Sequence, residues 1–123
     1  MSTRVSEELL REAVRFHGHL GPFLALGLKA GLYAVEVLGR DPFKMKAVVG
    51  TEPRPPRSCF VDGVQITTGC TMGKRNITLK EGGGLSVLFS KEELRLFLKV
   101  KDLLKRSVQS LFEVELITSR RTT

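Results

Sequence analysis

The chain has 123 residues, of which 41% are hydrophobic and 27% are charged. This length and balance fit one globular domain that buries its own core, and they exclude a disordered chain. The formal net charge of +7 favours anionic partners. Lysine and arginine are nevertheless interspersed with acidic residues, and no basic run with aromatic residues between them occurs, so we expect no nucleic-acid partner.

Two helices are predicted at the start of the chain. The first covers about 7–17, with Ser6 as its N-cap, apolar residues along one face, and Gly18 as its terminator. The second starts at Pro22, a residue type favoured in the first turn, and runs to about Leu38. Because the segment 22–38 is apolar nearly all round, we expect it to be the central helix of the fold.

The central apolar segment does not predict a membrane span. It is too short for a bilayer and it carries Lys29 and Glu36. The N-terminus also has no apolar stretch of the kind found in signal peptides, so we predict a cytoplasmic protein with no membrane partner. Gly27 and Gly31 lie one turn apart in this helix. They would let another backbone approach closely, either within the fold or across a homodimer.

The middle of the chain predicts a strand, an irregular segment and a further helix. The strand is expected over 44–50, and the segment 51–57 that follows holds three prolines and must be irregular. Residues 59–68 fit a third helix that Gly69 would end, although their β-branched residues also allow a strand.

The rest of the chain alternates between apolar and polar residues. This pattern predicts strands over 76–80, 85–90, 94–100 and 112–117. The first two, with three glycines between them, are expected to pair as a hairpin, and Asp102 is expected to cap a helix that runs to about Ser110. The whole order predicts an α+β fold: a single domain with a mostly antiparallel sheet of about five strands packed with helices.

Both histidines and both cysteines lie in two short segments, 16–22 and 59–74, which indicates a site. His17 and His19 are two residues apart, and this spacing on a loop can turn both imidazoles toward one point. Imidazole and thiolate together are ligands that suit zinc. His17 falls on the apolar face of the first helix, so a buried core histidine is the alternative there. His19 is the better candidate for a ligand or an acid–base group.

Cys59 and Asp62 would share one face of the third helix. A carboxylate inside an otherwise apolar helix needs a partner. Asp62 would therefore either orient a histidine ligand or hydrogen-bond a neighbouring loop. A straight helix would separate the sulfur atoms of Cys59 and Cys70 by roughly 15 Å, so that they would not share one ion. We favour Cys59 as the companion of the histidines.

Cys70 is a second chemical candidate. Two cysteines in a chain expected in the cytoplasm argue against a structural disulfide. Lys74 follows Cys70 by four residues, and a nearby ammonium group favours the thiolate, so Cys70 is a candidate nucleophile or, alternatively, a small buried thiol. The segment 69–75 lacks the glycine spacing and the Ser or Thr of a P-loop, which excludes nucleotide hydrolysis of that type. It leaves open an anion contact at Lys74 or Arg75.

With both segments read, the chain resembles the E-subunit family of formylmethanofuran dehydrogenase over most of its length. The family has a His-Gly-His opening, then a Cys-x-x-Asp-Ala-x-Gln motif, and then a Thr-Gly-Cys-Thr-x-Gly-Lys motif. The matching residues here are His17, Gly18, His19, Pro22, Gly27, Gly31, Cys59, Asp62, Gln65, Thr68, Gly69, Cys70, Thr71, Gly73, Lys74 and Asn76. Gly21 stands where the family usually has a cysteine, and Gly63 stands where it has an alanine.

The resemblance implies an α+β fold, a homodimer, and a pocket built around the matched histidine, cysteine and aspartate residues. The family name refers to a molybdenum or tungsten enzyme that reduces carbon dioxide onto methanofuran, which implies a redox (one-carbon) enzyme as a partner. We expect residues 1–123 to form one domain of this family, without the cysteine-rich zinc ribbon of its longer members.

The leading hypothesis is therefore a small metal- or ligand-binding protein, accessory to a redox enzyme. His17, His19 and Cys59 would bind zinc or another divalent transition metal, and three protein ligands would leave one position open. Asp62 and Gln65 would be further cofactor-binding residues.

Two alternatives belong to other classes of protein. The first is a metal-independent enzyme with catalytic residues Cys70 and Lys74, in which Cys70 is the nucleophile and His19 is its acid–base partner. The second is a non-catalytic dimeric module in which the motif shapes only an interface.

Overall fold

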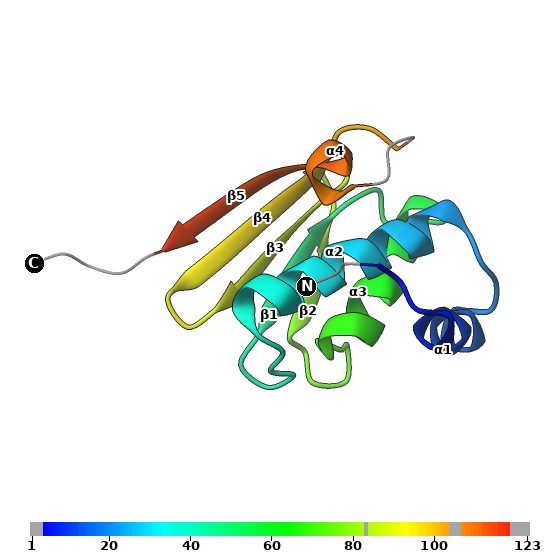
Figure 1. The fold of residues 1–123 in the computed structure, drawn as a ribbon, viewed down its shortest axis with the longest axis horizontal. Coiled ribbons are helices and arrows are strands. Elements are labelled where there is room, and N and C mark those ends of the chain that lie inside the picture. The colour runs from blue at the N-terminus through cyan, green and yellow to red at the C-terminus, as the bar shows by residue number, and fades with distance from the viewer. Residues whose placement is uncertain (1–3, 83, 104–106, 119–123) are drawn as a thin grey trace, which may run out of the picture.

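The computed structural model describes residues 4–82, 84–103 and 107–118. Its helices are α1 (Glu7–His17), α2 (Pro22–Leu38), α3 (Phe60–Thr68) and α4 (Val108–Leu111), with a single 3-10 turn, η1 (Arg57–Cys59), directly before α3. Its strands are β1 (Lys46–Gly50), β2 (Ile77–Lys80), β3 (Ser86–Lys91), β4 (Leu94–Val100) and β5 (Phe112–Thr118). The predicted α+β fold with a five-stranded, mostly antiparallel sheet is confirmed (Figure 1).

Local chemistry accounts for the bounds of the first two helices. The Ser6 hydroxyl accepts a hydrogen bond from the Leu9 amide at 3.1 Å, which satisfies one free donor of α1. Gly18 ends α1 with φ at 116°, a conformation that favours glycine. Pro22 opens α2, as predicted. The turn 18–21 between the two helices is therefore short and defined at both ends.

The sheet has the order β2-β1-β3-β4-β5. The predicted hairpin of 76–80 with 85–90 is wrong, because β2 pairs in parallel with β1, whereas β3 pairs antiparallel with the other edge of β1 and with β4. A parallel neighbour requires a crossover connection, and α3 provides it between β1 and β2. Alternation identified both segments as strands, but it carries no information on which strand each one pairs with.

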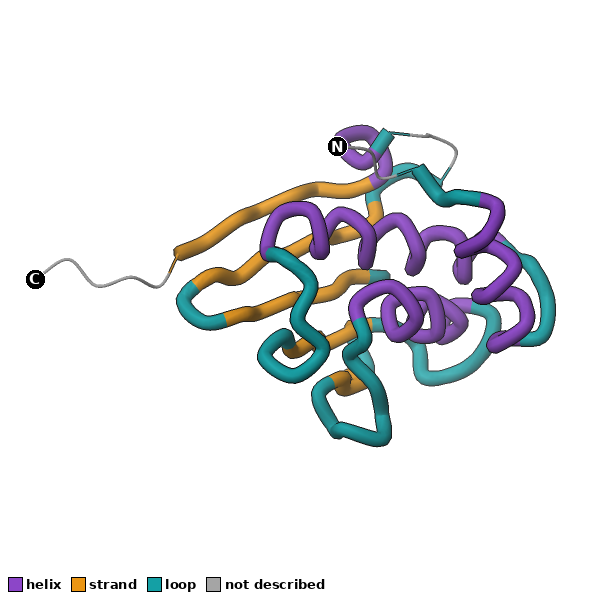
Figure 2. Tube along the Cα trace, turned by 60° about the horizontal axis from the view of Figure 1, so that its bottom comes forward, coloured by secondary structure: helices purple, strands orange, loops and turns teal. Residues whose placement is uncertain are grey.

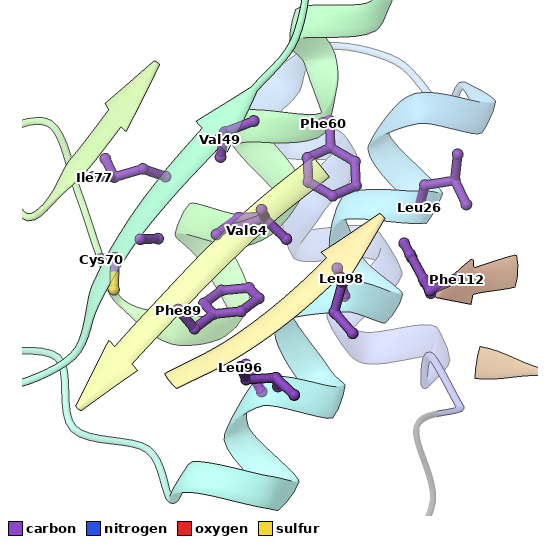
Figure 3. Close-up of a cluster of buried hydrophobic side chains, with 14 of the residues drawn as sticks. Leu26, Val49, Phe60, Val64, Cys70, Ile77, Phe89, Leu96, Leu98 and Phe112 are labelled. Carbon is purple, nitrogen blue, oxygen red and sulfur yellow. The ribbon is translucent and has the colours of Figure 1, made fainter. Parts of the chain in front are cut away.

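The core lies between one face of the sheet and the helices α2 and α3, which gather on the same side of it (Figure 2). Alternate residues of the three central strands point to this side and are fully or almost fully buried: Ala47, Val49, Val87, Phe89, Leu96 and Leu98. Phe60 and Val64 of α3 meet them from the helical layer (Figure 3). A smaller cluster of Ala13, Leu24 and Leu28 attaches α1 to this layer.

The glycines of α2 serve the contact with α3. A Cβ atom at Gly27 would collide with the Phe60 carbonyl oxygen and lie 3.1 Å from the Gly63 Cα, and one at Gly31 would collide with the Thr67 side chain. Close approach within the fold therefore explains both glycines without a dimer interface. The homodimer stays a prediction.

The last predicted helix is shorter than expected where the structure describes it. The N-cap of α4 is Ser107, whose hydroxyl accepts from the Ser110 amide at 3.3 Å, and not Asp102. The Asp102 amide is directed to the Leu111 carbonyl at 3.4 Å, so residue 102 lies beside the end of α4 instead of at its start. Residues 104–106 of the predicted helix lie outside the described residues. Within the described part of the chain, no helix has the length and apolar character that crossing a bilayer requires.

Candidate functional site

Three segments enclose a cavity of about 110 Å³. The end of α1 and the turn after it contribute His17 and His19, the start of α2 contributes residues 21–24, and the segment before α3 contributes Pro55, Pro56 and Cys59. The structure thus brings the three predicted metal ligands, His17, His19 and Cys59, to one cavity.

The partner of His17 is Asp62 of α3. The His17 Nδ1 atom lies 2.6 Å from Asp62 Oδ2, and the two side chains are 11% and 32% exposed. An ionised carboxylate only accepts hydrogen bonds, so Nδ1 carries the proton in this contact. In the neutral imidazole, Nε2 is then left with a free lone pair, which is the state that a metal ligand requires.

Gln65 extends this contact away from the cavity. Its Nε2 donates to Asp62 Oδ1 at 3.2 Å, and its Oε1 accepts from the Met72 amide at 3.0 Å. Asp62 and Gln65 were predicted to bind a cofactor. Their hydrogen bonds in the structure instead place them in support of His17, through which they influence the cavity.

His19 and Cys59 differ in their surroundings. His19 is exposed, and its ring centroid lies 5.2 Å from that of His17. Cys59 is half-buried, and desolvation by this burial raises the pKa of its thiol, with a further increase from the negative charge of Asp62. The Cys59 side chain is therefore a protonated thiol near neutral pH, and a metal would have to displace that proton.

Gly21 occupies a position that faces His19. A Cβ atom at Gly21 would lie 3.3 Å from His19 Nε2. A side chain at this position would therefore point to an imidazole of the cavity. This is the position at which the family that the sequence resembles has a cysteine.

Cys70 does not belong to this cavity, and its surroundings argue against the predicted role as a nucleophile with Lys74. The Cys70 side chain is fully buried in the main core, and its Sγ donates to the Met45 carbonyl at 3.4 Å. Burial raises the pKa of this thiol. Lys74 instead donates to the Gly69 carbonyl and to Thr71 Oγ1. The alternative interpretation of Cys70 as a small buried thiol agrees with this arrangement.

Labelling with iodoacetamide near neutral pH is expected to distinguish the two cysteines. Cys59 should react slowly, because it is partly accessible but its thiol has a raised pKa, and Cys70 should react only after denaturation. Mass spectrometry of digested protein measures the modification at each site, with Cys70→Ser as the control. Modification of Cys70 in the native protein ahead of Cys59 would contradict the burial described above.

The walls of the cavity include residues that the motifs did not indicate. Pro55 and Pro56 form one side, and Phe23 lies beneath the guanidinium group of Arg57, 5.7 Å from the ring centroid. The run of prolines directly before Cys59 was the available signal, but it predicted only an irregular segment. Among the residues that the structure describes, no three His, Cys, Asp or Glu side chains are close enough together to hold a metal ion as they lie.

Comparisons with known proteins place these features in context. A family model described as "FmdE, Molybdenum formylmethanofuran dehydrogenase operon" matches residues 16–119. A probable S-adenosyl-L-methionine-binding protein of Archaeoglobus fulgidus is 38% identical over 117 residues, with 75% of this chain and 32% of that protein covered. The chain thus spans about a third of the length of this curated relative.

A solved structure extends the similarity to the fold. The crystal structure of an FmdE-like protein of tungsten formylmethanofuran dehydrogenase from Syntrophus aciditrophicus matches 91% of this chain and 71% of its own chain, with a TM-score of 0.65 and 17% identity. At that identity the match shows a shared fold.

Proposed function

Because the chain belongs to the FmdE family, we propose that it is a small metal-binding protein, accessory to a redox enzyme of one-carbon chemistry. His17, His19 and Cys59 hold a divalent transition metal, zinc in the first place, in the cavity between α1, α2 and the start of α3. The observation that carries the proposal is the 2.6 Å contact of His17 Nδ1 with Asp62, which turns the unprotonated Nε2 into a metal donor.

The chemistry of the donor set favours zinc. Two imidazoles and a thiol are nitrogen and sulfur ligands, which zinc prefers over the oxygen ligands of calcium and magnesium. A histidine that binds metal through one ring nitrogen commonly donates from the other to a carboxylate, which fixes its tautomer. Asp62 has this relation to His17.

The size of the cavity favours an ion over a larger ligand. Pockets for drug-sized molecules have volumes of about 300–1,000 Å³. The cavity here has about 110 Å³, which corresponds to an ion with a few water molecules at about 30 Å³ each. S-adenosyl-L-methionine, which the name of the Archaeoglobus fulgidus relative mentions, is a drug-sized molecule and exceeds this space.

Metal binding requires a rearrangement of side chains. His17 is fixed by Asp62, and Cys59 is attached to the start of α3, whereas His19 is exposed on the turn between two helices. Rotation of an exposed side chain is fast and needs no change in the backbone. His19 is therefore the ligand that moves, and an ion bound by three protein ligands would polarise a water or a carbonyl group at its open position.

Zinc titration of tag-free protein by calorimetry tests the proposal. We expect a single zinc ion per chain, with binding that is weakened by His19→Ala and by Cys59→Ser and is unchanged by Cys70→Ser, since Cys70 lies in the core. Gly21→Cys adds a thiol that faces His19, so it should tighten binding. Below the raised pKa of the Cys59 thiol, the affinity should increase about tenfold per pH unit, because one proton is released for each ion bound.

The contrary result is equally clear. If native protein binds no zinc, cobalt or nickel, and Gly21→Cys does not create binding, the cavity is not a metal site. Binding that survives both His19→Ala and Cys59→Ser would place the ion elsewhere. A titration with S-adenosyl-L-methionine beside these measurements separates the two ligands directly.

A further inference from the structure

Two loops lie side by side at the end of the molecule where α2 and α3 finish (Figure 2). Residues 40–44 connect α2 to β1, and residues 69–76 connect α3 to β2; we call them the loop pair. Asn76 joins them, because its Nδ2 donates to the Pro42 carbonyl at 2.7 Å and to the Met45 carbonyl at 3.2 Å. Its Oδ1 accepts from the Thr71 amide at 2.8 Å, so both loops have a fixed shape.

The loop pair exposes two large apolar side chains. Phe43 is 81% exposed and Met72 is 63% exposed. The Lys74 Nζ lies 5.7 Å from the centroid of the Phe43 ring, so a side chain of one loop covers that of the other. Aromatic residues and methionine are enriched in the buried centres of protein interfaces.

The loop pair is also positively charged. It has four cationic residues and a single carboxylate: Arg40, Lys44, Lys74 and Arg75 against Asp41. The Asp41 carboxylate accepts from the Lys44 and Phe43 amides at 3.0 and 3.1 Å, and these hydrogen bonds lower its pKa. Its charge is thus directed to the backbone of its own loop, while the cationic side chains surround the apolar pair.

We propose that the loop pair docks an acidic segment of a partner protein, with Phe43 and Met72 as apolar anchors and Lys74 and Arg75 as cationic contacts. The complementary segment has carboxylates beside at least one apolar side chain. A protein partner fits better than a lipid surface, because the hydrogen bonds of Asn76 and Asp41 fix the loops before binding. This lowers the entropy cost of a specific interface and brings no benefit for insertion among mobile lipids.

The loop pair is connected to the cavity by hydrogen bonds. The Met72 amide donates to Gln65, Gln65 donates to Asp62, and Asp62 holds His17. A partner that presses on Met72 therefore acts on the residue that orients the imidazole. Docking itself does not depend on metal binding, so the failure of either proposal leaves the other standing.

NMR titration of ¹⁵N-labelled, metal-free protein tests the docking. The probe is a synthetic peptide of alternating glutamate and leucine, with a glutamine–leucine peptide and phosphatidylcholine–phosphatidylserine vesicles as comparison arms. We expect shifts of amide signals in 41–44 and 70–76 that weaken as salt is raised. Arg75→Glu combined with Met72→Ser should weaken binding about tenfold or more, and Phe43→Ser should weaken it independently.

The matched control makes the same kinds of change elsewhere. Arg95→Glu combined with Leu116→Ser alters an exposed arginine and an exposed leucine on β4 and β5, and should leave the affinity unchanged. Equal losses in both double variants, shifts centred on other elements, or stronger binding to the vesicles than to the acidic peptide would each overturn the proposal. Spectra of the free variants, unchanged outside the substituted loops, establish that each one is folded.

Discussion

Replacing Gly27 by alanine is expected to lower the free energy of unfolding by about 2 kcal/mol. The added methyl group would collide with the Phe60 carbonyl oxygen, and a backbone atom cannot turn aside as a flexible side chain does. Overpacking of this kind costs about 3 kcal/mol, and the better helix propensity of alanine returns about 1 kcal/mol. The melting temperature should fall by roughly 6–8 °C.

Chemical denaturation followed by circular dichroism measures this difference. Gly82→Ala is the matched control, because a Cβ atom there has no neighbour within 4 Å. We expect no more than a small change in that variant. Equal stability of Gly27→Ala and the native protein would mean that α2 and α3 can separate without cost, contrary to their close packing.

Replacing Asp62 by asparagine is expected to weaken zinc affinity by about 10- to 100-fold, the usual effect of losing the group that supports a metal-bound histidine. The side chain keeps its shape, but its amide can donate to Nδ1. The imidazole proton would then move to Nε2, the nitrogen that faces the metal, and block it. Calorimetric titration of zinc into metal-free protein measures the change.

Asp41→Asn is the control for this second prediction. It removes the same charge from a carboxylate that caps the loop 40–44 and does not contact a histidine. Its zinc affinity should equal that of the native protein. If both variants lost affinity equally, the effect would come from the net charge of the protein and not from the tautomer of His17.

The sequence was sufficient where neighbouring residues decide the structure. Ser6, Gly18 and Pro22 act within one or two turns of their own positions, and the predicted bounds of α1 and α2 are confirmed. The apolar alternation of 94–100 likewise identified a strand. These features depend on local hydrogen bonding and on periodicity, both of which are visible in the order of residues.

Long-range contacts were less accessible. The place of β2 beside β1 depends on the path of α3, which no alternation of β2 itself encodes. The pairing of His17 with Asp62 joins residues 45 positions apart, and the motifs indicated only that Asp62 needed some partner. The burial of Cys70 was also hidden, because the chain around it reads as a polar, glycine-rich turn.

The crossover through α3 determines which side of the cavity can yield. Both ends of α3 continue into neighbouring strands of the sheet, so Cys59 and Asp62 are tethered to the most rigid layer of the molecule. The amino-terminal helix has no such double attachment and lies at the periphery, against α3 (Figure 1). Entry and exit of a ligand therefore fall to α1 and its turn, which would swing like a hinged flap and carry the two histidines while the thiol stays in place.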